Sequence, residues 1–235
     1  MVVENAQIAS ASSRSSRLHR AAILRAWNMP VLLVVIVAAI FVLPVLAPLS
    51  DLGEIIDDLS LTLVLLSGAA AIAERRRTHL LTVTLCAVAV ALRWLEWLVP
   101  SSISTLWREG SALLALILVL GIVAARVFKG GEAVTFDRVM GAVVLYLLLG
   151  IAWAAAYEIV AIYAANAFVG GDIHARGPAR WMYFSFVTLT TVGYGDITPV
   201  APAARSLAVI EALLGQLYPA IILARLVSLV SLQRK

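Results

Sequence analysis

Long apolar runs separated by short polar connections make up most of the chain. Each of six runs has about the 20 residues that a membrane-spanning helix needs. A seventh apolar segment, Ala179–Thr190, is only twelve residues long, or about 18 Å as a helix, which is too short to cross. The pattern predicts six spans: Pro30–Leu49, Ile55–Ala73, His79–Val99, Ser104–Phe128, Val134–Phe168 and Ala203–Val230.

The charges of the polar connections alternate from one side of the membrane to the other. Lysine and arginine gather in the N-terminal tail, in "ERRR" (Glu74–Arg77), in the connection after the fourth run and at the C-terminus. Because basic connections stay on the cytoplasmic side, both termini are expected to be cytoplasmic. Residues 1–27 are expected to form a cytoplasmic tail, and a basic helix on the membrane surface at Leu18–Trp27 is an open alternative.

The composition excludes several classes of function. The chain is 62% hydrophobic and 14% charged, whereas soluble domains are about 45–50% apolar. Its net charge of +4 is spread over short connections, which does not favour nucleic-acid binding. The single cysteine, Cys86, lies in an apolar run and is expected to pack there. The three histidines are scattered, and no nucleophile has a partnered base, so neither an enzyme nor a cofactor is expected.

The short segment at Ala179–Thr190 requires a different path through the membrane. Pro178 suits the start of a helix, and the last span must begin outside and end inside. The short helix must therefore enter the membrane and return to the same side. This path places the following "TTVGYGD" (Thr190–Asp196) at membrane depth. Irregular backbone is tolerated there only where protein buries it or where it lines a water-filled path.

Glycines at alternate positions give this loop an unusual freedom. Gly193 and Gly195 can adopt left-handed conformations that other residues avoid. An alternation of left- and right-handed residues would aim the carbonyls of residues 191–194 to one side, and symmetric copies would form rings that replace the hydration shell of a cation. Neutral carbonyls favour a monovalent ion, since divalent ions prefer carboxylates. The nearby carboxylate, Asp196, lies at the outer rim.

The motif "TTVGYGD", preceded by "YFSFVTL" and followed by a proline and a long helix, resembles the pore loop of potassium channels. The resemblance covers residues 136–231 and implies a selectivity filter. In the family's pattern, K⁺ is bound by the Thr191 hydroxyl and by the carbonyls of the filter, which here comprises Thr191, Val192, Gly193, Tyr194 and Gly195. The supporting residues that the resemblance implies are Thr190, Asp196, Trp181 and Tyr183.

The pore helix also departs from that family pattern. Many members have a tryptophan pair or a carboxylate where this chain has Tyr183-Phe184 and Val187. We therefore expect the hydrogen bonds behind the filter to differ. Tyr194 is expected to point outward, toward aromatic residues of the pore helix.

The last span contains two local breakers and two polar residues. Gly215 and Pro219 lie one turn apart, and they form either a gate hinge or a close packing contact followed by a fixed bend. Glu211 and Gln216 are costly in lipid and must face protein or water. The resemblance puts Gln216 in the cavity below the filter. Glu211 is expected to pack behind the pore helix, as a pH-sensitive group or as a structural carboxylate.

The first four spans resemble a voltage sensor only in layout. The fourth span lacks the regular arginines of such sensors, since Arg108 and Arg126 stand at its two ends as interfacial anchors. Arg93 and Glu96 lie one turn apart in the third span. They could pair with each other or with acidic residues of the second span, in a structural role or in an unusual field-sensing one.

The sequence therefore predicts an all-α membrane protein with six transmembrane helices, a re-entrant pore helix and a filter loop, assembled as a homotetramer. Its expected parts are the tail at 1–27, a four-helix membrane domain at 28–130 and a pore domain at 131–235. The expected function is potassium-selective conduction in a plasma membrane, with lipid and K⁺ as partners.

Two alternatives remain open. One is a non-selective monovalent cation channel. The other is a potassium transporter subunit, in which one chain would carry four pore repeats, whereas this sequence has one copy of the motif. Five residues follow Val230, so no ligand-sensing domain is expected there, and the sequence names no gating stimulus.

Overall fold

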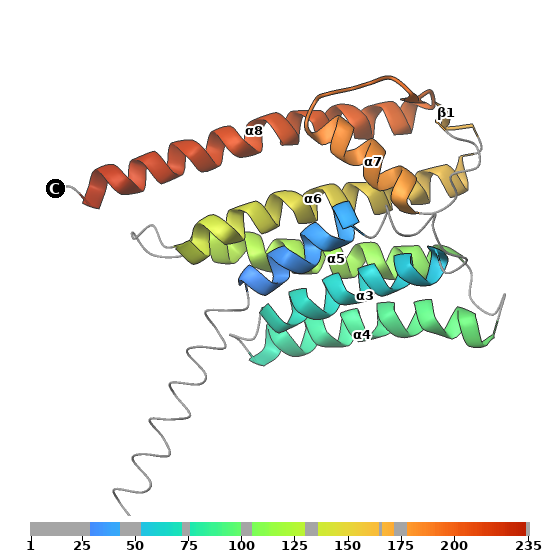
Figure 1. The fold of residues 1–235 in the computed structure, drawn as a ribbon, viewed down its shortest axis with the longest axis horizontal. Coiled ribbons are helices and arrows are strands. Elements are labelled where there is room, and N and C mark those ends of the chain that lie inside the picture. Colours follow the sequence, from blue (N-terminus) through green and yellow to red (C-terminus); the bar gives the residue numbers. More distant parts are fainter. Residues whose placement is uncertain are drawn as a thin grey trace, which may run out of the picture.

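The protein is a bundle of long helices lying side by side (Figure 1). The structure is a computed structural model that describes residues 29–42, 53–71, 76–99, 105–129, 136–164, 166–171 and 178–233. The predicted tail at 1–27 lies outside the described residues, as does Gly130-Gly131. The described elements are the helical segment Met29–Val42, which ends in the π-helix η1 (Ala38–Val42), and then α3 (Gly53–Ala71), α4 (Arg76–Leu98), α5 (Thr105–Lys129), α6 (Phe136–Tyr163), β1 (Phe168–Gly170), α7 (Pro178–Leu189), β2 (Ile197–Pro199) and α8 (Pro202–Gln233).

Among the described residues, four helices are long and apolar enough to cross a membrane. These candidate spans are Leu80–Leu98, Thr105–Phe128, Arg138–Tyr163 and Pro202–Arg225. The first predicted span is described only as far as Val42, and α3 carries several acidic residues near its start. A mostly helical, multi-pass protein is therefore confirmed, while the count of six spans remains a prediction.

The fifth predicted span ends earlier than the sequence pattern indicates. The helix stops at Tyr163, Asn166 has a φ of 66°, and Phe168 begins a strand instead of ending a helix. Strand β1 pairs with β2 in antiparallel register, with Phe168 opposite Pro199. Strands of three residues are too short to show a period-two pattern, so the all-α prediction missed this sheet. The sheet ties the segment before α7 to the segment that follows the filter.

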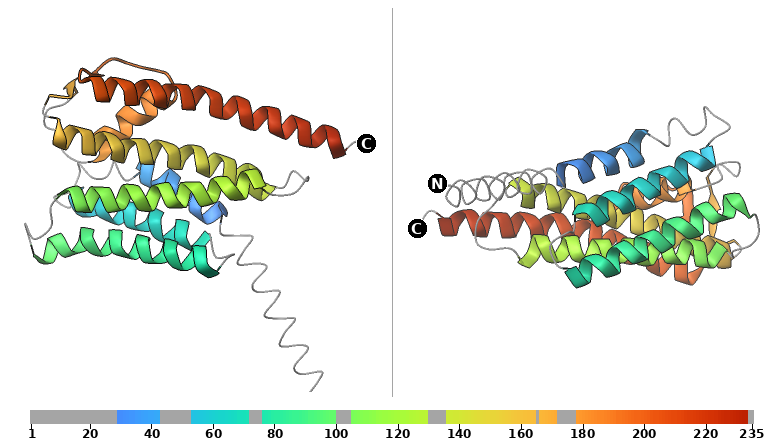
Figure 2. Two further views of the ribbon diagram at one scale, coloured as in Figure 1. Left: turned by 180° about the vertical axis from the view of Figure 1, so that it is seen from behind. Right: turned by 90° about the horizontal axis from the view of Figure 1, so that it is seen from below.

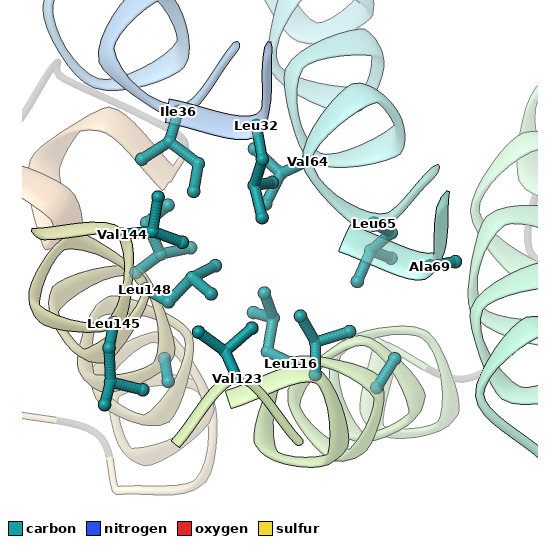
Figure 3. Packing of buried hydrophobic residues seen from close by; sticks show 14 of the residues in the cluster. Leu32, Ile36, Val64, Leu65, Ala69, Leu116, Val123, Val144, Leu145 and Leu148 are labelled. Carbon is teal, nitrogen blue, oxygen red and sulfur yellow. The ribbon is translucent and has the colours of Figure 1, made fainter. Parts of the chain in front are cut away.

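The helices are arranged so that α6 separates the pore elements from the remaining helices. Figures 1 and 2 show α7 and α8 on one side of α6, with α5 on the other side and α3 and α4 beyond it. Helix α7 packs against both α6 and α8. Figure 3 shows side chains from different helices meeting in one hydrophobic core, among them Leu32, Val64, Leu116 and Leu148. This core joins helices from both sides of the predicted domain boundary near residue 130.

Candidate selectivity filter

Helix α7 ends where the loop Thr190–Asp196 begins, and the two are joined by backbone hydrogen bonds. The amides of residues 190–193 donate to carbonyls of residues 186–188 in the last turn of α7. The Val187 carbonyl accepts from both Val192 (3.0 Å) and Gly193 (3.3 Å). Carbonyls at the end of a helix have no partner within the helix, so the loop supplies their missing donors. The loop is therefore held in a fixed position relative to α7.

The backbone of the loop alternates between left- and right-handed conformations. Thr191, Gly193 and Gly195 have positive φ values of 58°, 57° and 81°, and the residues between them do not. This is the alternation expected from the spacing of the two glycines. Thr191 is the exception to that logic, because a β-branched residue rarely adopts a positive φ. Such strain costs about 1–3 kcal/mol and clusters at functional sites.

The polar groups of this loop are divided between two directions. Its first amides are bound to α7, whereas no hydrogen bond in the described part of the chain ends on the carbonyls of residues 191–194. Residues 190–196 are all exposed in the single chain. The loop thus presents a row of neutral acceptor oxygens whose backbone is anchored from behind. Such a row has the chemistry to coordinate a dehydrated monovalent cation.

The outer rim of the loop is held by a side chain of α7. The Tyr183 hydroxyl faces the Asp196 carboxylate closely enough to interact with it. Both residues were predicted to support the filter, and the structure brings them together. Beyond Asp196, the buried Ile197 begins strand β2.

Trp181 and Tyr194 are not brought together within one chain. Trp181 of α7 is buried, and its ring centroid lies 4.8 Å from that of Phe168. Phe184 completes this aromatic cluster with Tyr157 of α6, at a centroid distance of 4.8 Å. The Tyr194 side chain is 72% exposed. Within the described part of the chain, the expected contact of Tyr194 with pore-helix aromatics is therefore not formed.

Gly215 allows α8 to approach the end of α7 closely. A Cβ atom at this position would lie 1.8 Å from the Leu189 carbonyl oxygen, which no side chain can tolerate. Of the two roles considered for Gly215, close packing is thus observed directly. Helix α8 continues through Pro219 to Gln233. The gate hinge remains a prediction.

Gln216 contacts Thr191, the residue expected to be innermost in the filter. Its Nε2 atom donates a 2.7 Å hydrogen bond to the Thr191 hydroxyl. The resemblance put Gln216 near the cavity below the filter, and the structure brings its side chain to Thr191. The strained Thr191 is consequently held from two sides. Its amide donates a hydrogen bond to α7, and its hydroxyl accepts a hydrogen bond from α8.

Glu211 links three helices behind the pore loop. Its side chain is fully buried, with Oε1 2.5 Å from the Ser185 hydroxyl of α7 and Oε2 2.5 Å from the Tyr157 hydroxyl of α6. The predicted position behind the pore helix agrees with this geometry. Ser185 and Tyr157 were not predicted as partners, because each shares its helix with other hydroxyl-bearing residues and no local signal singles it out.

Five charged residues of α3, α4 and α5 form one network. Arg93 pairs with Asp58 of α3 and with Glu109 of α5, the latter at 3.5 Å. Glu96 pairs at 2.7 Å with Arg108, which the sequence analysis treated as a simple interfacial anchor. The considered Arg93–Glu96 pair is therefore not the one that forms. Alternation of charge along one helix could not reveal which neighbouring helix supplies the partner.

A small cavity lies between this network and the pore elements. Its volume is about 50 Å³, and its lining includes Arg93 and Glu109 from the network, Glu158 from α6 and Met182 from α7. No cluster of metal-ligating side chains is found among the described residues.

The C-terminal half of α8 contacts the neighbouring ends of α5 and α6. Arg225 donates to the Phe128 carbonyl in the last turn of α5, and its guanidinium lies 5.2 Å from the Phe128 ring centroid. The Tyr218 hydroxyl donates to the Ala142 carbonyl of α6 at 2.7 Å.

Comparison with known proteins supports the pore elements specifically. Residues 143–231 match the family model described as "Ion channel". Two rice proteins (Oryza sativa subsp. japonica) are similar to this chain over stretches slightly shorter than the family match. "Two pore potassium channel b" is 40% identical over 81 residues, covering 34% of this chain and 21% of the relative. "Two pore potassium channel c" is 41% identical over 75 residues, covering 30% and 16%.

A bacterial relative is also similar over a shorter stretch. "Protein LctB" of Geobacillus stearothermophilus is 52% identical over 46 residues, which is 20% of this chain and 34% of that protein. The chain thus spans only a minor part of the relatives that it matches. No solved structure matches the chain significantly. Residues 143–231 thus resemble an ion-channel domain, and four helices among the described residues are long and apolar enough to cross a membrane.

Proposed function

We propose that this chain is one subunit of a potassium-selective channel that passes K⁺ passively through the loop Thr191–Gly195. The observation that carries the proposal is the alternation of φ along this loop, with its amides bound to α7 and its carbonyls left as acceptors. The names of the two rice relatives and the ion-channel family match support the same conclusion. The K⁺ ions of the filter are the bound species in this proposal, and no other cofactor is required.

The channel is a homotetramer in this proposal. One chain supplies one pore motif, and rotational symmetry is what converts rows of carbonyls into rings. Helix α8 supports this assembly because most of its apolar side chains are exposed in the single chain. These exposed residues include Val209, Ile210, Leu213, Leu217 and Ile221. Neighbouring subunits, the cavity and lipid would cover them, and Tyr194 would find its aromatic partner in a neighbouring pore helix.

We place the tetramer in the plasma membrane with both termini in the cytoplasm, on the strength of its basic connections. Gating by voltage in the usual way is not part of the proposal. The interior of α5 is uncharged, and Arg108 near its start is bound to Glu96 and Glu109. Charges held in ion pairs at one end of a helix do not supply the regular series that a sensor needs.

Ion flux into liposomes that contain the purified protein tests the proposal. Uptake of radioactive rubidium is compared between vesicles loaded with K⁺ and vesicles loaded with Na⁺. We expect uptake to be driven by trapped K⁺ and not by trapped Na⁺. Equal uptake with both ions would favour the non-selective alternative. Uptake by a protein that purifies as a single chain would favour the transporter-subunit alternative.

Two glycine variants make the assay specific for the filter. An added Cβ has open space within the chain at both Gly193 and Gly121, but only Gly193 has a positive φ. We expect Gly193→Ala to abolish rubidium uptake because alanine resists the left-handed conformation. Gly121→Ala, on helix α5, should leave uptake unchanged. Normal selective uptake by Gly193→Ala would refute the assignment of the filter.

A further inference from the structure

The hydrogen-bond geometry around Glu211 determines where a proton must lie. Three close contacts form a chain of oxygen atoms through the interior. The Tyr157 hydroxyl is 2.5 Å from Glu211 Oε2, and the Ser185 hydroxyl is 2.5 Å from Glu211 Oε1. The same Ser185 hydroxyl is 2.8 Å from the Gly150 carbonyl of α6. Each contact is within hydrogen-bond distance, so each needs one proton.

Counting the protons separates the two forms of Glu211. A serine hydroxyl has one proton to donate, and a carbonyl or an ionised carboxylate can only accept. If Glu211 were ionised, Ser185 could serve Glu211 or Gly150, and the other contact would bring two acceptor oxygens together without a proton. If Glu211 is protonated, its Oε1–H donates to Ser185, which donates to Gly150, while Tyr157 donates to Oε2. Only the protonated form satisfies all three contacts.

The surroundings of Glu211 agree with this count. The titratable groups facing its carboxyl are Tyr157 and, farther away, Tyr146, both from α6, while α7 presents the hydroxyl of Ser185. None of the ion pairs among the described residues includes Glu211. Placing an isolated carboxylate in such a buried position is strongly unfavourable, whereas a neutral acid whose two oxygens are both hydrogen-bonded is not.

We propose that Glu211 is a neutral carboxylic acid in the folded channel, and that its proton joins α8 to α7 and, through Ser185, α7 to α6. Glu211 is then a positioning residue for the filter, because the loop is bound to the last turn of α7 and moves with it. Ionisation at alkaline pH removes this proton, so Ser185 can keep only one of its two contacts, and the link from α7 to either α6 or α8 is weakened. The effect on conduction rests on the proposed channel function, whereas the protonation state does not.

Infrared spectroscopy of the purified wild-type protein tests the protonation state independently of conduction. We expect a carbonyl-stretching band of a protonated carboxylic acid at neutral pH, which disappears on titration to alkaline pH. Glu211→Gln should remove this band. Glu158→Gln, which changes another acidic side chain of the membrane interior, should leave the band of Glu211 in place. Absence of the band at neutral pH, or its persistence in Glu211→Gln, would overturn the proposal.

Rubidium flux across a pH titration then tests the positioning role. Glutamine offers a hydrogen-bond donor and an acceptor, as the neutral acid does, but it cannot ionise. The rubidium flux of Glu211→Gln should therefore be normal and should stay constant as the pH rises. Wild-type flux should fall several-fold over the range in which the infrared band is lost. Ser185→Ala removes the hydrogen bond to Gly150. Its rubidium flux should therefore be as low at every pH as the wild-type flux is at alkaline pH.

The outcomes are distinguishable. Failure of Glu211→Gln to assemble or conduct, or a wild-type flux that ignores the loss of the band, would contradict the positioning role. A band that behaves as expected in a protein without any rubidium flux would instead count against the proposed channel function.

Discussion

At the scale of single residues, Thr191 shows how strain is maintained in this loop. Its φ of 58° is unfavourable for a β-branched side chain, and two hydrogen bonds oppose its relaxation. One joins its amide to the Thr188 carbonyl, and the other joins its hydroxyl to Gln216. The innermost position of the filter therefore depends on two different helices.

The Gln216 contact leads to a first prediction. Gln216→Ala removes the donor to the Thr191 hydroxyl, so we expect the preference for K⁺ over Na⁺ in the flux assay to fall several-fold. Because Gln216 is exposed in the single chain, the free energy of unfolding should change by less than about 1 kcal/mol. Ser206→Ala, at another exposed polar position on α8, is the control. An unchanged ion preference would mean that the contact does not shape the innermost site.

Gly215 gives a second prediction, in which two effects oppose each other. Replacing a helical glycine by alanine ordinarily stabilises a helix by about 1 kcal/mol. At Gly215 the added Cβ would collide with the Leu189 carbonyl, and overpacking of this kind costs about 1–3 kcal/mol or more. We therefore expect Gly215→Ala to lower the melting temperature of the protein. Gly121→Ala, where the added Cβ meets nothing, should not lower it, and a stabilised Gly215→Ala would contradict the packing described here.

Several of these residues could be identified from sequence because their chemistry is local. The motif from Thr190 to Asp196 and the spacing of its glycines are visible in the letters alone. The position of Gln216 was implied by the resemblance to potassium channels and not by the residues alone. The partners of Glu211 could not be identified, since Tyr157 lies 54 residues away and hydroxyls in apolar helices have many alternative partners.

At the scale of helices, burial separates two kinds of ion pair in α3, α4 and α5. The side chains of Arg93 and Glu109 are almost fully buried, whereas those of Arg108 and Glu96 remain 25% and 31% exposed. A buried pair that loses one partner leaves an uncompensated charge. An exposed pair contributes little, because water screens it.

A third prediction follows from this difference. Arg93→Ala leaves Asp58 and Glu109 without their shared cation, and we expect the free energy of unfolding to fall by about 3–5 kcal/mol. Glu96→Gln should change it by about 1 kcal/mol or less. Thermal unfolding in detergent, followed by circular dichroism, measures both. Equal effects of the two substitutions would mean that burial does not govern this network.

The helices themselves followed well from hydrophobic pattern, and their partners did not. Runs of apolar residues predicted α4, α5 and α8 to within a few residues, because length in a bilayer is a simple constraint. The end of α6 was misplaced since Phe168 is as apolar as the helix before it. Arg93 illustrates the general difficulty, because its neighbours are set by helix packing that a single sequence does not display.

At the scale of the whole molecule, the proposed symmetry gives a fourth prediction. The purified protein should have the mass of four chains by native mass spectrometry. Leu213→Arg, which places a charge on the exposed apolar face of α8, should reduce the tetramer in favour of smaller species. Leu106→Arg, at an exposed position near the start of α5, should retain it. A wild-type protein without tetramers would require a different account of how the carbonyl rings close.

Helix α8 has contacts with two different parts of the protein along its length. Its outer half touches the filter assembly through Glu211, Gly215 and Gln216, and its inner half is attached to the end of α5 through Arg225. Pro219 lies between these attachments. If α8 bends at Pro219, it would act as a lever, in which a displacement arriving from α5 moves the C-terminal half while the half that contacts Thr191 stays in place. In the proposed channel, such a lever would change the size of the current without changing the ion that carries it.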